Sequence, residues 1–303
     1  MAELAIVSEQ TVRDIVTRAM AYDAIRAAFE AVAVGRSSVF DVVIGTGLND
    51  GEAFAIKSGL DRENEMVGFK CGTYWAGNHN LDLPAHGSTI LLLDPATGFP
   101  KALIGASYLN GYRTAAANAV ATDFLAQKDA SVLGVIGAGQ QAEQEIRALL
   151  EIRPIERIKV FTRTEERKSD LSTRLEDIEA EIHFTTARDT VAGSDIVTTV
   201  TPSTSALVKK EWLEPGMHIS AMGADDVGKH ELEAGIVEHA SLFADYPAQS
   251  MVIGEFQHAY RDGLIADAGQ ITAIGLVTLG EASGRTSDDE ITVFDSSGIA
   301  IQD

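Results

Sequence analysis

Residues 131–150, SVLGVIGAGQQAEQEIRALL, limit what this chain can fold into more than any other segment. An apolar run leads directly into three small residues in the spacing G-x-G-x-x-A, and a helix-forming stretch follows. In a strand–turn–helix context the first glycine permits a tight turn, the second lets the backbone approach a pyrophosphate, and the small third residue allows close helix–strand packing. The pattern predicts a dinucleotide site rather than a glycine-rich turn with a purely structural role. The expected cofactor contacts here are Gly137, Gly139, Gln140, Gln141 and Ala142.

The region after residue 130 alternates strand-like apolar runs with helix-forming stretches. Such alternation, beginning in a nearly continuous apolar run, is typical of a doubly wound parallel sheet. We therefore predict an α/β fold with a Rossmann-like domain over residues 130–284. The expected strands are 131–137, 157–162, 181–186, 195–200, 218–223 and 240–246, with helices over 140–151, 165–176 and around 187–192.

The first part of the chain has a different pattern. Residues 8–34 have apolar residues at a helical period and predict two short helices, or one helix broken near Tyr22 and Asp23. Strand-like runs separated by turn signals fill residues 39–105 and predict a mostly antiparallel or mixed sheet. An alanine-rich stretch without proline predicts a long helix over 108–127. We expect residues 1–129, joined by 285–303, to form this α+β domain.

The chain carries 24 Lys and Arg against 45 Asp and Glu among its 303 residues, a formal net charge of −21. Because nucleic-acid binding draws mainly on cations that neutralise phosphates, this balance argues against nucleic acid and anionic membranes as partners. No signal-peptide pattern and no apolar run of about 18 residues is present, so a cytoplasmic location is expected. A single cysteine, Cys71, excludes an internal disulfide, and the seven histidines lack metal-ligand spacing, so no metal site is predicted.

The end of the second predicted parallel strand indicates which dinucleotide binds. An NAD site usually carries an acidic residue there, which accepts a hydrogen bond from the ribose 2′-hydroxyl. This chain instead has Thr162, Arg163 and Thr164, with Arg167 one turn further on. Hydroxyl and guanidinium groups suit a 2′-phosphate better than a bare hydroxyl, so NADP(H) is favoured and NAD(H) is the alternative. In that alternative Arg163 only stacks on the adenine.

In so acidic a chain, basic residues without acidic neighbours are the candidates for binding a small anion. Lys57 and Lys70 lie in the similar strand contexts AIKSG and GFKCG, and Arg113 lies in the alanine-rich helix. Asp225 follows the apolar run HISAMG, at a strand end where doubly wound sheets place chemistry, and could act as a general acid or base. The loop that ends at His86 could border the substrate pocket. The alternatives are surface charges for the cations, a helix N-cap for Asp225 and a structural histidine.

Four segments resemble the ornithine cyclodeaminase/mu-crystallin family over almost the whole chain. They are GFKCGTYWAGN, DPATGFPKALIGASYLNGYRTAAANAVATDFLA, VLGVIGAGQQAEQEIRAL and ISAMGADDVGKHEL. The RTAAA helix followed at this spacing by the GAG turn is specific to that family, whereas the GAG turn alone is not. The resemblance implies a homodimer, in which the N-terminal domain dimerises and the Rossmann domain binds a nicotinamide cofactor. Members of the family include cyclodeaminases, alanine dehydrogenases, cyclic ketimine reductases and iminosuccinate reductases.

The resemblance also assigns roles to matching positions. Lys70 matches the lysine that contacts the substrate carboxylate and the reacting nitrogen, and Arg113 matches the arginine that binds the substrate carboxylate. Asp225 matches the aspartate that serves as acid or base, and Thr114 falls where a hydroxyl contacts the cofactor. The remaining expected cofactor contacts are Thr201 and Met222.

Two departures from the family pattern bear on the substrate. Cyclodeaminases have a glutamate shortly before the lysine, where it handles the substrate amine, and this chain has Lys57 there; the second arginine expected within VFDVVIG is absent. Like charges repel in a desolvated pocket, so Lys57 disfavours the cationic side chain of ornithine. We expect instead an NAD(P)H-dependent reductase of a small α-imino acid, with iminosuccinate as the best candidate and L-aspartate as product. The alternatives are an ornithine cyclodeaminase and a mu-crystallin-like protein that binds NADPH without turnover. The expected substrate contacts are Lys57, Lys70, His86 and Arg113.

Overall fold

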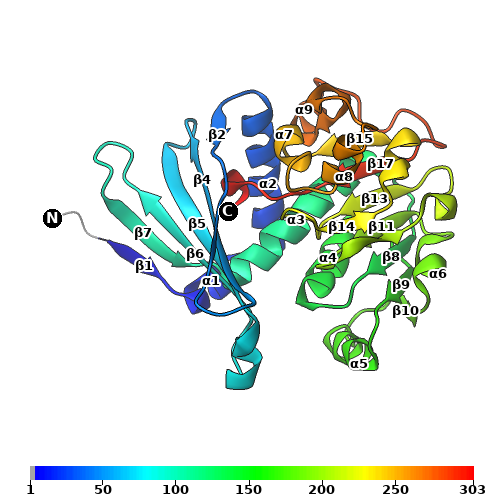
Figure 1. Ribbon diagram of the computed structural model, residues 1–303, viewed down its shortest axis with the longest axis horizontal. Helices are drawn as coiled ribbons and strands as arrows, with labels where there is room; N and C mark the ends of the chain where they lie inside the picture. Colours follow the sequence, from blue (N-terminus) through cyan, green and yellow to red (C-terminus); the bar gives the residue numbers. More distant parts are fainter. Residues whose placement is uncertain (1–3) are drawn as a thin grey trace. The chain divides into compact units, whose positions relative to one another are not determined.

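The computed structural model describes residues 4–303, apart from the side chain of His79, and consists of two compact units (Figure 1). The first unit comprises the chain up to Arg113 together with Ile299–Asp303, and the second comprises Thr114–Gly298. Both combine helices and strands, as the sequence predicts. Among the described residues, no helix has both the length and the apolar character needed to cross a bilayer.

A seven-stranded mixed sheet forms the body of the first unit. Its strands are β1 (Ala5–Val7), β2 (Ser37–Val39), β3 (Val43–Thr46), β4 (Glu52–Asp61), β5 (Met66–Trp75), β6 (His86–Leu93) and β7 (Pro100–Gly105). They lie in the order β1-β7-β6-β5-β4-β2, and β3 also pairs with β4. The pairs are antiparallel except that β1 runs parallel to β7. Two 3₁₀ turns, η1 (Ala76–Leu81) and η5 (Ala300–Gln302), complete the unit.

Two helices, α1 (Glu9–Ile15) and α2 (Arg18–Ala33), precede the sheet strands β2 to β7. The break between them falls at Val16 and Thr17, so the expectation of a break near Tyr22 and Asp23 is wrong. Thr17 has an extended backbone, and its side-chain oxygen accepts a hydrogen bond from the N–H of Met20 at 3.2 Å. Because this cap satisfies a free donor of the new helix, α2 starts there and runs through Tyr22.

An eight-stranded parallel sheet forms the body of the second unit. Its strands are β8 (Val132–Ile136), β9 (Arg157–Phe161), β10 (Glu181–Phe184), β11 (Ile196–Thr199), β13 (His218–Ala221), β15 (Ser241–Ala244), β16 (Thr272–Ala273) and β17 (Thr292–Asp295). The order β10-β9-β8-β11-β13-β17-β15-β16 extends from β8 in both directions, which is the arrangement of a doubly wound sheet. The predicted Rossmann-like fold is confirmed.

Helices α4 (Gln140–Leu150), α5 (Glu165–Arg174) and α6 (Ala187–Val191) connect the first four strands of this sheet. Buried Leu133 and Ile158 of the sheet share one core with Ile146 of α4 and Leu171 of α5. Strands β12 (Thr204–Val208) and β14 (His230–Leu232) form a separate parallel pair. The remaining elements are η2 (Lys210–Trp212), η3 (Ala234–Glu238), α7 (Pro247–Ser250), α8 (Gln257–Arg261), η4 (Ala268–Gln270) and α9 (Ile274–Thr278).

The boundaries of the two units differ from those expected from the sequence. Helix α3 (Ser107–Leu125) continues across the boundary, which lies at residues 113/114 rather than 129/130. Its later half belongs to the second unit because Asn118 is fully buried and donates hydrogen bonds to Glu145 and Thr198. The segment that returns to the first unit is shorter than 285–303, since β17 pairs with β13 and β15 and only Ile299–Asp303 return.

Candidate active site

Two of the predicted cations, Lys57 and Lys70, lie directly opposite each other on the neighbouring antiparallel strands β4 and β5. Their exposed fractions are 7% and 6%, so neither is a surface charge. Like charges facing each other across a sheet destabilise it, and burial of an ammonium group adds a further cost. Such a pair is typical of a functional site, where the repulsion is offset when an anion binds.

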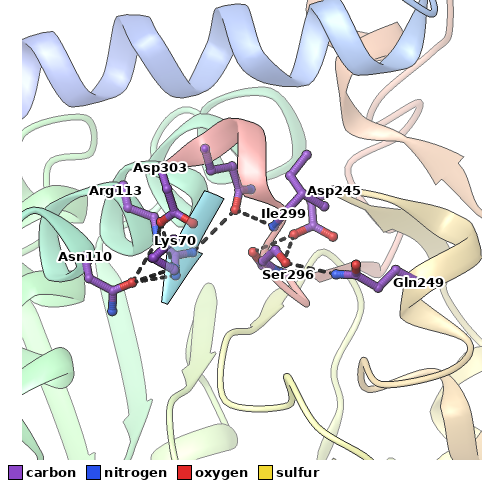
Figure 2. A network of polar contacts seen from close by, with 10 residues as sticks. Lys70, Asn110, Arg113, Asp245, Gln249, Ser296, Ile299 and Asp303 are labelled. Atoms are coloured by element: carbon purple, nitrogen blue, oxygen red, sulfur yellow. Dashed lines mark hydrogen bonds and ion pairs between the residues drawn. The ribbon is translucent and has the colours of Figure 1, made fainter. Parts of the chain in front are cut away.

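Lys70 and Arg113 meet at the carboxylate of Asp303 (Figure 2). The Lys70 Nζ lies 2.8 Å from Asp303 Oδ1, and the Arg113 Nε lies 3.0 Å from the same oxygen. Asn110 connects the two cations a second time, because its Oδ1 accepts from Lys70 Nζ at 3.0 Å and from Arg113 Nη2 at 2.7 Å. Gln302 Oε1 accepts from Arg113 Nη1 at 3.4 Å. The structure thus gathers β5, the start of α3 and η5 around one charged cluster.

Three members of this cluster, Asn110, Gln302 and Asp303, were not expected from the sequence. Asn110 could have been predicted, because it precedes Arg113 by three residues in the RTAAA helix and residues at this spacing share a helix face. Asp303 could not have been predicted, since it is 233 positions away from Lys70 and no local sequence pattern connects them. Only the return of the chain to the first unit brings this carboxylate to the lysine.

Burial, together with the charges of Arg113 and Lys57, lowers the pKa of Lys70 to about 7, although the carboxylate of Asp303 acts in the opposite direction. Burial alone would raise the pKa of Asp303, but Lys70 and Arg113 hold it below its usual range. Asp303 Oδ2 is buried without a hydrogen-bond partner among residues 4–303. The cluster is therefore a partly neutralised cationic site, suited to a small anion.

The pKa of Lys70 predicts how substrate binding depends on pH. Above about pH 7 the lysine loses its proton, so the KM for an anionic substrate should rise with pH. Because Asp303 favours the protonated lysine, Asp303→Asn should lower the pKa of Lys70 further and move this rise to lower pH. Steady-state KM measured on both sides of neutrality for the two proteins checks this. Superimposable profiles would contradict the coupling between Asp303 and Lys70.

His86 is not brought to the cluster. It begins β6 and is exposed, with its ring 4.8 Å from the ring of Tyr74. The residue of β6 that faces Lys70 is Ile90, four positions further on, which is about 13 Å along an extended strand. Within the first unit His86 therefore lies apart from Lys70, and its contact with the substrate stays a prediction.

The glycine turn of the second unit lies between β8 and α4, where the sequence predicts a dinucleotide site. Gly137 has φ +125°, and a Cβ on it would lie 2.7 Å from the carbonyl oxygen of Val200, so this position needs glycine. A Cβ on Gly139 would meet no atom within 4 Å, which leaves open space beside the turn. Gly139 begins α4 without a side-chain cap, and Ala142 is fully buried in the core with Leu133. These residues fit a pyrophosphate at the start of α4.

The other predicted cofactor residues lie at the ends of nearby strands and in α4. Arg163 and Arg167 are exposed, and neither side chain forms an ion pair or hydrogen bond within the described chain. Thr164 caps α5, with its hydroxyl accepting from the N–H of Arg167 at 3.4 Å.

The remaining predicted cofactor residues differ in exposure. Gln140 is exposed, whereas the side chain of Gln141 donates a hydrogen bond to Glu145 at 2.7 Å. Thr114 and Thr162 are half-buried, and Met222 is buried.

Asp225 lies in the loop after β13, as expected from the sequence. Its side chain is 51% exposed and forms an ion pair with Lys229. The neighbouring Asp226 accepts a hydrogen bond from the N–H of Val227 at 2.7 Å. Thr201, in the loop after β11, donates through its N–H and hydroxyl to Glu231.

Comparison with known proteins shows to which family the chain belongs. Residues 3–303 match the model of the ornithine cyclodeaminase/mu-crystallin family. The chain belongs to this family. It is 35% identical to the iminosuccinate reductase of Paracoccus denitrificans (strain Pd 1222), over 98% of this chain and 92% of the relative. It is 34% identical to the alanine dehydrogenase of Archaeoglobus fulgidus, over 99% of this chain and 92% of the relative.

Solved structures of family members share the fold. The Paracoccus denitrificans iminosuccinate reductase in complex with NAD⁺ has a TM-score of 0.92 at 35% identity, covering 99% of this chain and 92% of the other. An archaeal alanine dehydrogenase dimer with bound NAD has a TM-score of 0.91 at 32% identity, with coverage of 99% and 92%. The Thermococcus litoralis Δ¹-pyrroline-2-carboxylate reductase in complex with NADH and L-proline has a TM-score of 0.91 at 27% identity, with coverage of 98% and 93%. The predicted family, fold class and oxidoreductase class are confirmed.

Proposed function

We propose that this member of the family uses a nicotinamide dinucleotide to reduce a small α-imino acid, and that this substrate is iminosuccinate, giving L-aspartate. The observation that carries the choice is Lys57, a buried cation directly opposite Lys70. When Lys70 is protonated, the two lysines and Arg113 are three cationic groups near the carboxylate of Asp303, a set that suits a dicarboxylate. The similarity to an iminosuccinate reductase supports the same choice.

Each group has a role in this proposal. Arg113 and Lys70 would hold the α-carboxylate, and Lys57 would hold the second carboxylate through charge-assisted hydrogen bonds. The glycine turn at Gly137 and Gly139 would hold the dinucleotide, which when bound in its reduced form supplies the hydride for the C=N carbon. Asp225 would manage the proton at the substrate nitrogen or at water. The imino acid thereby gains one hydride at carbon and one proton at nitrogen and becomes the amino acid.

The dinucleotide could carry a 2′-phosphate. Thr162 and Arg163 follow the end of β9. In a typical NAD site this position holds an acidic residue, which accepts a hydrogen bond from the ribose 2′-hydroxyl. Exposed Arg163 and Arg167 could both pair with a phosphate, which supports NADP(H). The solved relatives contain NAD⁺, NAD or NADH, which supports NAD(H). Comparing kcat/KM for NADPH and NADH decides between them, and a strong preference for NADH would overturn the 2′-phosphate proposal.

Cyclodeamination of ornithine is the competing activity within the family, because the chain is also 32% identical over 70% of its length to an ornithine cyclodeaminase of Agrobacterium fabrum. Buried Lys57 opposes it, since a cationic side chain repels the cationic end of ornithine. The deciding assay monitors oxidation of NADPH and NADH with iminosuccinate, pyruvate plus ammonia, and the cyclic imines of proline and pipecolate. Ammonia release from ornithine without net consumption of NAD(P)H would overturn the reductase.

Replacing Lys57 tests the dicarboxylate itself. Lys57→Ala should raise the KM for iminosuccinate by about 10- to 100-fold, because the second carboxylate loses its partner. The imine formed from pyruvate and ammonia lacks that carboxylate, so its KM should change much less. Lys57→Arg is the matched control, since it keeps the charge. Equal changes for both substrates would mean that Lys57 does not recognise a second carboxylate.

We further propose that the protein is a homodimer. The family resemblance implies dimerisation through the N-terminal domain, and the archaeal alanine dehydrogenase structure contains a dimer. The sheet of the first unit also exposes apolar side chains that a partner could cover, among them Ile6, Val43, Ile44, Met66 and Leu103. Light scattering of the purified protein measures the oligomeric state.

A further inference from the structure

Glu231 is a buried carboxylate without a role in the proposed reaction. It lies in β14 with an exposed fraction of 0%. Its Oε1 accepts hydrogen bonds from the N–H and the hydroxyl of Thr201 at 2.6 and 2.7 Å. Its Oε2 accepts from the hydroxyl of Thr199 at 2.8 Å and from the N–H of Gly223 at 3.0 Å. All four donors lie on other parts of the chain, so this single side chain connects separate segments.

The segments that Glu231 connects are the loops after two neighbouring parallel strands. Thr199 ends β11 and Ala221 ends β13, and these two residues are register partners. Thr201 lies in the first loop and Gly223 in the second, two residues before Asp225. Ligands of doubly wound sheets bind at the carboxyl ends of the strands. Glu231 therefore holds together the two loops that carry a predicted cofactor contact and the predicted acid or base.

The loop after β13 is shaped around this carboxylate. A Cβ on Gly223 would lie 2.5 Å from Glu231 Oε2 and 2.3 Å from the carbonyl oxygen of Thr201. Only a residue without a side chain brings its N–H this close to the carboxylate and to the other loop. The contact thus depends on both partners, glycine on one side and a carboxylate on the other.

A second buried acid, Glu255, holds the backbone at Glu231 in place. The two carboxylate oxygens of Glu255 each accept from the N–H of Glu231 at 3.0 Å, and one also accepts from the N–H of Leu232 at 2.7 Å. The N–H of Glu255 donates to Asp295 Oδ2 at 2.9 Å, at the end of β17. This chain of contacts connects the backbone at Glu231 to the end of β17.

We propose that Glu231 is a positioning residue, which clamps the loop that carries Asp225 to the loop that carries Thr201. The clamp sets the distance and orientation between the acid or base and the cofactor contact, so Glu231 acts through the two loops that it connects. The proposal rests on the proposed roles of Asp225 and Thr201. The clamp itself rests only on contacts within the second unit, so it can be tested separately from the reaction.

The test compares Glu231→Gln with Thr199→Val. In the glutamine variant the amide nitrogen cannot accept from the N–H of Gly223, so one loop is released while the other can stay bound. The valine variant removes a hydroxyl donor to Glu231 and leaves both backbone donors in place. We expect Glu231→Gln to lower kcat by about 10- to 100-fold and to weaken NADH or NADPH binding, whereas Thr199→Val should keep kcat near that of the wild type.

Hydrogen–deuterium exchange gives a readout that needs no turnover. The amide of Gly223 should exchange faster in Glu231→Gln than in the wild type or in Thr199→Val. If Glu231→Gln does not fold, Gly223→Ala breaks the same contact from the other side and should show the same faster exchange and lower kcat. Unchanged exchange and kcat in Glu231→Gln, or an equal loss of kcat in Thr199→Val, would overturn the clamp. Faster exchange in a protein that reduces no imino acid would support the clamp and overturn the proposed function instead.

Discussion

Lys70→Met is expected to lower kcat/KM for an anionic imino acid by about 10³-fold or more, the largest loss of any single change in the first unit. Lys70 is buried and donates to both Asn110 and Asp303, so its ammonium group is held in one place. Methionine has a similar length and volume but no charge and no donor, so the packing of β5 is retained while the binding group is removed.

The same change should have a small effect on the free energy of unfolding. Burial and the charges of Arg113 and Lys57 disfavour the protonated lysine, as the lowered pKa of Lys70 shows. Asp303 keeps its contact with Arg113 when Lys70 is replaced, so its carboxylate is not left unpaired. Thermal unfolding and steady-state kinetics of Lys70→Met measure both effects. Lys101→Ala is the control, because Lys101 is an exposed lysine on β7 of the same unit. Retained activity in Lys70→Met would show that Lys70 does not bind the substrate.

The second unit was largely predictable from the sequence because its signals are local. Each expected strand from 131 to 246 is present, and the turn at Gly137 lies where the glycine spacing places it. Lys70 and Arg113 could be chosen because cations in apolar surroundings are rare in a chain of net charge −21. All of these inferences use neighbouring residues only.

Contacts between distant residues could not be predicted in this way. Asp303 binds Lys70 across 233 positions, and Glu231 accepts from Thr201 across 30. Nothing in the residues beside either carboxylate indicates its partner, because the contact follows from strand order rather than from local pattern. The same limit explains the return of Ile299–Asp303 to the first unit, which depends on where β17 enters the second sheet.

Gly139→Ala is expected to raise the Kd for NADH and NADPH on the order of 100-fold without lowering the melting temperature. The backbone at Gly139 has φ −75°, which alanine adopts without strain, and a Cβ there would meet no protein atom within 4 Å. The added methyl group therefore costs the free protein little. It would occupy the space through which a pyrophosphate must approach the start of α4, so the cost falls on the complex.

Gly137 provides the contrast that makes this result interpretable. At Gly137 the positive φ and the 2.7 Å approach to the carbonyl oxygen of Val200 mean that alanine strains the protein whether or not a cofactor is bound. Gly137→Ala should therefore lose both stability and cofactor affinity, whereas Gly139→Ala should lose affinity alone. Fluorescence titration with the reduced dinucleotides and thermal unfolding of both variants measure the two quantities. A wild-type Kd in Gly139→Ala would show that the open space beside the turn is not where the pyrophosphate binds.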